Sequence, residues 1–151
     1  LRYHDDVMGD LTLNVGVMRF SQNGQGTILL NFRYPQGVNV QAVTTQVQRH
    51  LGAFAATVEV WPGGMEPHLV PETDELVGTL SLVYAKQTGM YMNPRTSNGG
   101  SYARLLKRGV AFGGQFPDVP VTSHQANEST PVANLTRSMA IFAESLLKLA
   151  K

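Results

Sequence analysis

The proline-containing segment MEPHLVP, residues 65–71, constrains the fold of this chain most strongly. Two prolines in seven residues disfavour both a helix and a central strand, so the segment predicts an extended linker. Alternating apolar residues dominate before it, and helical spacing dominates after it. The pattern therefore predicts two parts, residues 1–66 and residues 67–151, which together form an α+β fold.

The first part has the pattern of an antiparallel sheet covered by one helix. Residues 10–22 and 27–35 alternate apolar and polar side chains around the turn sequence NGQG, which predicts a β-hairpin. Val40, Val43, Val47 and Leu51 recur at helical spacing after Asn39, a residue type that favours helix N-caps. Residues 56–64 predict a further short strand that ends at a proline.

The second part is predicted to be an α/β segment, with helices around one or two short strands. Residues 72–89 carry a helical apolar stripe and end in glycine, and residues 131–151 predict a long closing helix with Ser129 or Thr130 as its N-cap. The apolar run VAFGGQF, residues 110–116, predicts a short buried strand.

Composition narrows the classes of function. The net charge is +1, from 12 basic and 11 acidic residues, and no basic stripe supports nucleic-acid binding. No apolar run approaches the length of a membrane span, and the absence of cysteine excludes thiolate catalysis and favours a cytoplasmic protein. Charged residues make up only 15%, which indicates a surface partly covered by something outside this chain. The start at Leu1 suggests a piece of a longer polypeptide.

The sequence HQANE contains one candidate metal ligand, His124, and two residues that could support it. His124 lies in a predicted loop beside a buried segment, where ligands are often presented, and a neutral imidazole suits zinc. Asn127 or Glu128 would orient the ring through hydrogen bonds. The alternative is a loop histidine bonded to a nearby carbonyl. One histidine cannot hold a metal ion, so further ligands would have to come from elsewhere.

Two other features are candidates for binding a carboxylate. Arg33 ends a predicted strand, and its planar guanidinium can bind a carboxylate through two parallel bonds. The alternative is a solvated charge at the end of a strand. Gly99, Gly100 and Ser101 precede a predicted helical turn, where backbone N–H groups can bind an anion. The alternative is a tight turn without a ligand.

Several motifs together resemble a known family. HDDVMGDLTLNVG, NFRYPQGVN, EPHLVP, VYAKQTG, GGSYARLLKRGVAFG and HQANES follow the order and spacing of the C-terminal third of PepV-type dipeptidases. These are bacterial dinuclear zinc peptidases related to carnosinase, aminoacylase, carboxypeptidase G and succinyl-diaminopimelate desuccinylase. The resemblance covers nearly the whole chain.

The resemblance implies a two-part assignment. Residues 1–66 match the second half of a lid domain that closes over a dipeptide, and residues 67–151 match the return of the chain into the catalytic domain. The parent enzyme would hold two zinc ions. Its general base and the other metal ligands would lie upstream, in the remaining N-terminal part, so this chain alone would be inactive.

The same resemblance implies roles for the candidate residues. His124 matches the last metal ligand, and Arg33 matches the lid arginine that grips the C-terminal carboxylate of the substrate. Gly99, Gly100 and Ser101 match a loop that contacts the same end, while Asn127 and Glu128 match residues that support the ligand. The alternative function is a non-catalytic α+β binding or dimerisation module resembling the lid.

Overall fold

A computed structural model describes residues 1–54 and 56–150 of the chain, which divide into two compact units. The first contains Leu1–Leu69 together with Thr96–Asn98, and the second contains Val70–Arg95 and the residues from Gly99 onward. The division after Leu69 falls within the proline-containing segment. The return of Thr96–Asn98 to the first unit, where the Thr96 hydroxyl donates to the Val7 carbonyl over 3.1 Å, has no signal in the sequence.

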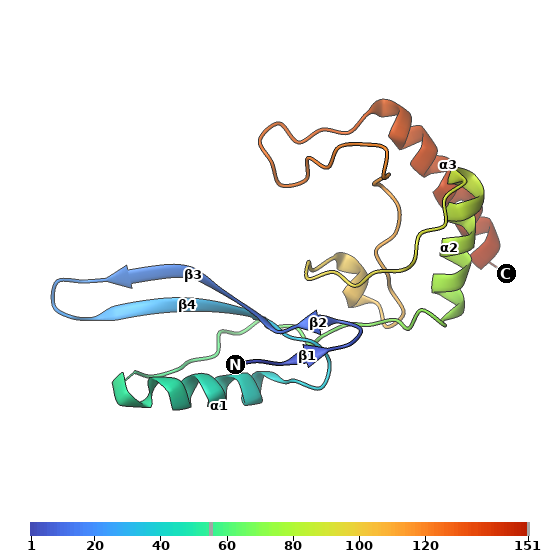
Figure 1. The fold of residues 1–151 in the computed structure, drawn as a ribbon. Coiled ribbons are helices and arrows are strands. Elements are labelled where there is room, and N and C mark those ends of the chain that lie inside the picture. Colours follow the sequence, from blue (N-terminus) through green and yellow to red (C-terminus); the bar gives the residue numbers. More distant parts are fainter. Residues whose placement is uncertain (55, 151) are drawn as a thin grey trace. The chain divides into compact units, whose positions relative to one another are not determined.

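The first unit is built on the predicted hairpin of β3, Thr12–Phe20, and β4, Gly26–Arg33 (Figure 1). The two strands are antiparallel, from Thr12 opposite Arg33 to Phe20 opposite Gly26. A second ladder of two residues per strand, β1 (His4–Asp5) with β2 (Gly9–Asp10), precedes it and was not predicted. The hairpin prediction is confirmed.

A bulge at Gly16 changes the face of the hairpin to which the following side chains of β3 point. Val15 lies opposite Leu30 and Val17 lies opposite Leu29, so Gly16 is the extra residue. Because side chains alternate along a ladder, the extra residue keeps four of the five large apolar residues of β3 on one face. They are Leu13, Val15, Met18 and Phe20. The opposite face receives Val17 together with Thr12, Asn14, Arg19 and Arg33, so the candidate arginine lies on the more polar face.

Helix α1, Val40–Leu51, runs along the hairpin in Figure 1 and begins as predicted. The Asn39 side chain accepts a hydrogen bond from the Ala42 backbone N–H over 2.9 Å, and Val43 and Val47 are buried. The strand predicted at residues 56–64 is wrong, because these residues form no strand. Alternation of Val58 and Val60 with polar residues satisfies the strand pattern, but a strand also requires a neighbour with free N–H and C=O groups.

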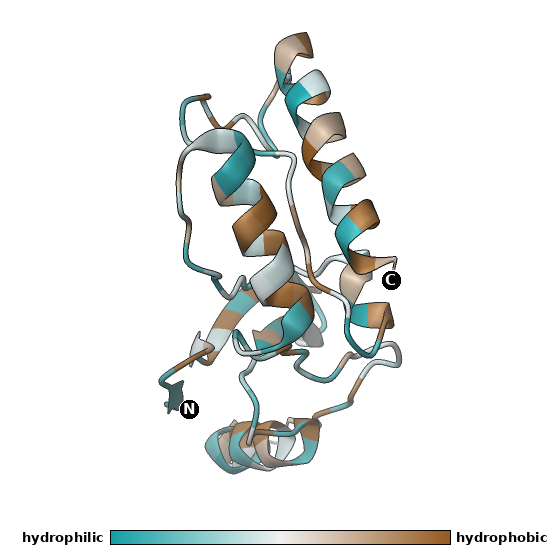
Figure 2. Ribbon diagram, turned by 90° about the vertical axis from the view of Figure 1, so that its right-hand side faces the viewer, coloured by the Kyte–Doolittle hydropathy of each residue, from teal (hydrophilic) through white to brown (hydrophobic). Residues whose placement is uncertain are grey.

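The second unit contains two helices, α2 (Glu75–Thr88) and α3 (Val132–Leu149), and a 3-10 helix at Tyr102–Leu105 (Figures 1 and 2). The Asp74 side chain caps α2 by accepting from the Leu76 N–H, and Gly89 ends it with a φ of 72°. The core of the unit consists of Val83, Tyr84, Phe116 and Ile141. Mixed helices and antiparallel strands fit the α+β class.

Two expectations for the second unit are wrong. Residues 110–116 form no strand, although Phe116 is only 1% exposed. Gly113 and Gly114 have φ values of 75° and 83°, which a strand does not accommodate, so the apolar run enters the core as a loop. The expected α/β character of this part is therefore absent from its described residues.

The start of α3 also differs from the prediction. Pro131 occupies the N-cap and Val132 is the first helical residue. Ser129 lies two residues before this N-cap, and its N–H and C=O are both bonded to the Thr122 hydroxyl, over 3.1 and 2.9 Å. Within the described residues, no helix has the length and apolar character needed to cross a bilayer.

Candidate functional site

Arg33 lies at the end of β4 with its side chain exposed. Its Nη1 donates a hydrogen bond to the Asn98 carbonyl. Among the described residues, no ion pair joins Arg33 to a carboxylate. A neutral carbonyl partner orients the guanidinium without neutralising it, so Arg33 keeps the charge and the donors that a bidentate carboxylate contact needs.

The glycine-rich loop follows Asn98 in the chain. Gly99, Gly100 and Ser101 are exposed, and Ser101 is the extended N-cap of the 3-10 helix without a capping bond from its hydroxyl. A side chain added at Gly100 would lie 3.5 Å from Nη1 of Arg104. The loop is therefore accessible to a ligand, and its role in binding a carboxylate stays a prediction.

His124 lies in an exposed loop, as the sequence predicts. The loop is closed at its base by the bonds between Thr122 and Ser129 and by the Gln125 N–H, which donates to the Thr122 carbonyl over 3.1 Å. The His124 N–H donates to Oε2 of Glu128 over 3.2 Å. Glu128 thus acts on the backbone at His124, and this contact fixes the loop rather than the imidazole ring.

The same loop contains unusual backbone conformations. His124 and Asn127 have φ values of 63° and 60°, and they are the non-glycine residues with positive φ in the described part of the chain. Such conformations cost roughly 1–2 kcal/mol for a non-glycine residue and cluster at functional sites. Sequence analysis missed this strain, although asparagine and histidine are enriched in the left-handed region.

The metal-binding capacity of this chain is limited. The described residues contain no group of three or more His, Asp or Glu side chains that could hold a metal ion. A catalytic zinc site needs about three protein ligands. His124 fits as one ligand with an accessible ring, and the remaining ligands would have to come from outside the chain.

The histidine near the N-terminus is a poorer candidate for a ligand. Nδ1 of His4 lies 2.7 Å from Oδ1 of Asp10, and its Nε2 lies 3.6 Å from Oδ1 of Asp6. The hydrogen bond to Asp10 raises the pKa of His4, although burial opposes it. Both ring nitrogens face carboxylates that favour the protonated imidazolium, and a metal requires the neutral ring.

Ion pairs hold the frame of the second unit. Arg108 donates to both carboxylate oxygens of Asp74, over 2.7 and 3.2 Å, and these bonds hold the pKa of Asp74 below its usual value. Glu144 of α3 accepts from Lys86 over 2.7 Å and from Gln87 over 2.5 Å. These bonds tie α3 to α2 and lower the pKa of Glu144.

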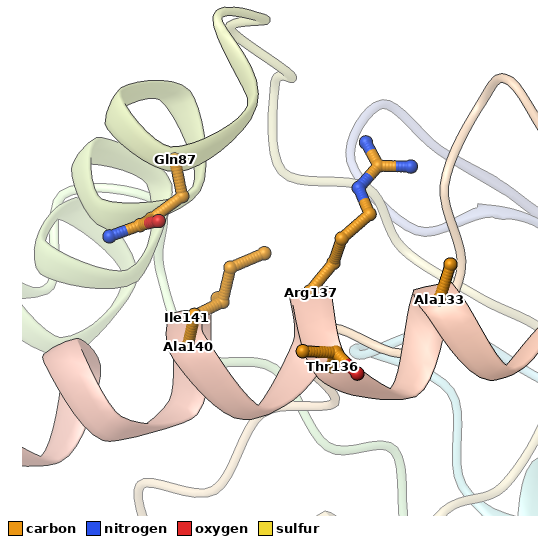
Figure 3. A pocket seen from close by; sticks show the side chains of 6 residues that line it. All are labelled: Gln87, Ala133, Thr136, Arg137, Ala140 and Ile141. Carbon is orange, nitrogen blue, oxygen red and sulfur yellow. The ribbon is translucent and has the colours of Figure 1, made fainter.

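A pocket opens between α2 and α3 (Figure 3). Gln87 lines it from α2, and the α3 side chains that line it are Ala133, Thr136, Arg137, Ala140 and Ile141. Nη1 of Arg137 donates to both carboxylate oxygens of Asp118, and the guanidinium lies 4.0 Å from the centroid of the Phe116 ring. The charge of Arg137 is therefore already paired, and the residues predicted for the site lie elsewhere.

Comparison with known proteins identifies similar sequences, whereas no protein-family model matches. The chain is 41% identical over 150 residues to the "Beta-Ala-Xaa dipeptidase" of Lactobacillus delbrueckii subsp. lactis. The chain is similar to dipeptidases. Proteins named "Putative dipeptidase" are 36% identical in Staphylococcus saprophyticus and 34% in Staphylococcus epidermidis, each over 149 residues. Each match covers 99% of this chain but only 31–32% of the relative, so the chain spans about a third of these proteins' length.

Proposed function

We propose that this chain is the C-terminal third of a zinc-dependent dipeptidase of the PepV type. The observation that carries the proposal is the identity of 41% with a protein named for cleavage of β-alanyl dipeptides, over 99% of the chain. The substrate class is a dipeptide with a free C-terminal carboxylate. Residues 1–66 would belong to a lid that closes over the substrate, and residues 67–151 to the catalytic domain.

Arg33 is the residue that would hold the substrate carboxylate. Its position on the polar face of the hairpin and its uncharged partner, the Asn98 carbonyl, support this role. A guanidinium binds a carboxylate through two parallel hydrogen bonds, which fixes both distance and orientation. By the same resemblance, the exposed loop of Gly99, Gly100 and Ser101 would contact this end of the substrate.

His124 would be one metal ligand, presented by the loop that Glu128 and the strained Asn127 shape. Two zinc ions in the complete enzyme would activate a water molecule and polarise the peptide carbonyl. The general base and the other ligands would come from the N-terminal part of the longer protein. A catalytic zinc ion needs about three protein ligands, which supports the proposal that most of the ligands lie outside this chain.

The experiment compares His124→Ala with His50→Ala in the longer protein that contains this chain. Both histidines are exposed, but His50 lies near the end of α1 and has no assigned role. We expect His124→Ala to abolish most hydrolysis of a β-alanyl dipeptide and to lower the bound zinc measured by mass spectrometry, whereas His50→Ala changes neither. Full activity and full zinc content in His124→Ala would refute the proposal.

A further inference from the structure

The C-terminal helix α3 has an apolar stripe that the described chain leaves largely exposed, although Phe142 packs edge-on against Phe112. Its six large side chains follow the spacing three, four, three, four, three along the helix, which aligns them on one side. Their exposed fractions range from 37% to 77%. They are Val132, Leu135, Met139, Phe142, Leu146 and Leu149.

The buried polar side chains of α3 lie beside Ile141, between the stripe and the charged side of the helix. They are Asn134, Ser138 and Ser145. The charged residues of the helix are Arg137, Glu144 and Lys148, and at about 100° per residue they fall within a sector of about 40°. Glu144 and Arg137 in that sector are bonded to Lys86 and Asp118, so the charges of α3 lie toward its own unit.

This arrangement is the reverse of that of a surface helix. A helix at the surface of a finished domain turns its apolar stripe inward and its charges outward. We infer that the stripe of α3 is an intramolecular docking surface for an apolar element in the part of the longer protein that this chain lacks. The inference rests on the proposed function, because it requires that longer protein.

The length of the relatives and the small size of the stripe favour this occupant. The chain covers only 31% of the Lactobacillus relative, so about two thirds of a protein of that length lie outside it. A stable dimer of separate chains usually needs about 20–30 residues from each side, whereas the stripe offers six large side chains on one helix. Docking within one polypeptide needs less surface, because chain connectivity raises the effective concentration.

A lipid surface fits the stripe poorly. Helices that lie on membranes carry many lysine and arginine residues on their polar face. The basic residues of α3 are Arg137 and Lys148, and Arg137 is already paired with Asp118. The helix therefore lacks the cluster of cations that would attract anionic lipids.

The test uses cysteine labelling, because the chain contains no native cysteine. Met139→Cys on the stripe is compared with Leu82→Cys on α2, since Met139 is 70% exposed and Leu82 is 68% exposed. Each variant is made in the 151-residue chain and in the longer protein, and its labelling by a maleimide is followed by mass spectrometry of the peptide. We expect Cys at position 139 to react at least about tenfold more slowly in the longer protein, and Cys at position 82 to react equally in both.

Each other outcome overturns the inference. If Cys at position 139 reacted equally fast in the 151-residue chain and in the longer protein, the rest of the longer protein would not cover the stripe. If positions 139 and 82 were slowed equally in the longer protein, the protection would not be specific to the stripe. Position 139 could also react slowly in the 151-residue chain alone. If that rate depends on protein concentration, a second copy of the chain covers the stripe. If it does not, another part of this chain covers it.

A second variant measures the same contact through stability. Leu146→Lys should lower the Tm of the longer protein and leave that of the 151-residue chain unchanged, whereas Leu82→Lys, at the same exposure of 68%, should lower neither. An unchanged Tm in the longer protein would contradict the inference. Labelling and melting do not depend on hydrolysis, so an inactive longer protein with a protected stripe would refute the proposed function alone.

Discussion

Replacing Phe116 with alanine should destabilise the second unit more than any surface change. The Phe116 ring is 1% exposed, stacks on Tyr84 with centroids 6.2 Å apart, and lies under the Arg137 guanidinium. Removal of a buried phenylalanine ring costs about 3–5 kcal/mol. The core is small and bordered by partly buried side chains that can relax, so we expect a value near the lower end, about 3 kcal/mol. With a urea m-value of about 1–3 kcal/mol per M, the midpoint should fall by about 1–3 M.

Two spectroscopic signals separate the units in this experiment. Helices α2 and α3 contribute 14 and 18 helical residues against 12 in α1, so circular dichroism at 222 nm reports mainly the second unit. The single tryptophan, Trp61, belongs to the first unit, and its fluorescence reports that unit. We expect the larger shift at 222 nm, or loss of that signal without urea.

The matched control is Tyr102→Ala, because Tyr102 is an aromatic residue of the same unit that is 91% exposed. This substitution should change the free energy of unfolding by no more than about 0.5 kcal/mol. If Phe116→Ala shifted the 222 nm transition no further than Tyr102→Ala, then Phe116 would not be at the centre of the core, and the packing argument would fail.

Two further predictions concern pH. Hydrogen bonds from Arg108 and Lys86 lower the pKa values of Asp74 and Glu144 below 3.8 and 4.5, respectively. The two pairs therefore stabilise the second unit fully above about pH 4.5. This stabilisation is lost as the pH falls through the lowered pKa values of the folded state. Urea midpoints at 222 nm should drop on acidification, and less steeply in Glu144→Gln. The hydrogen bond to Asp10 raises the pKa of His4 above 6.5. The His4–Asp10 pair therefore stabilises the β1–β2 ladder below pH 6.5, and this stabilisation is lost as the pH rises through the raised pKa. In NMR titration, Asp10→Asn should lower that pKa; an unchanged value would count against the pair.

Local features of the fold were predictable from sequence, because their causes are local. The hairpin follows from alternation around an Asn-Gly turn, and the start of α1 follows from the capping preference of Asn39. The strands expected at residues 56–64 and 110–116 failed for a different reason. A strand depends on a partner, and in the second case also on the φ values of Gly113 and Gly114, neither of which the apolar pattern encodes.

The candidate site shows the same division. The exposed loop position of His124 and the strand-end position of Arg33 could be predicted from turn and strand signals. The bond from Arg33 to Asn98 spans 65 residues, and the pair of Asp74 with Arg108 spans 34, so neither has a local signature. The contact of Glu128 with the His124 backbone depends on the loop conformation, which residue types alone do not determine.

The most direct measurement on the central claim is kcat/KM of the longer protein for a free dipeptide and for its C-terminally amidated form. Arg33→Lys keeps the charge but loses the two-bond geometry, which is worth roughly 1.5–3 kcal/mol, or about ten- to a hundredfold. We predict that loss for the free dipeptide and little further loss for the amide, whose carboxylate is already gone. Arg19→Lys, on the same face of the hairpin, should change neither. Unchanged kcat/KM for the free dipeptide in Arg33→Lys, or equal losses for both substrates, would contradict the account.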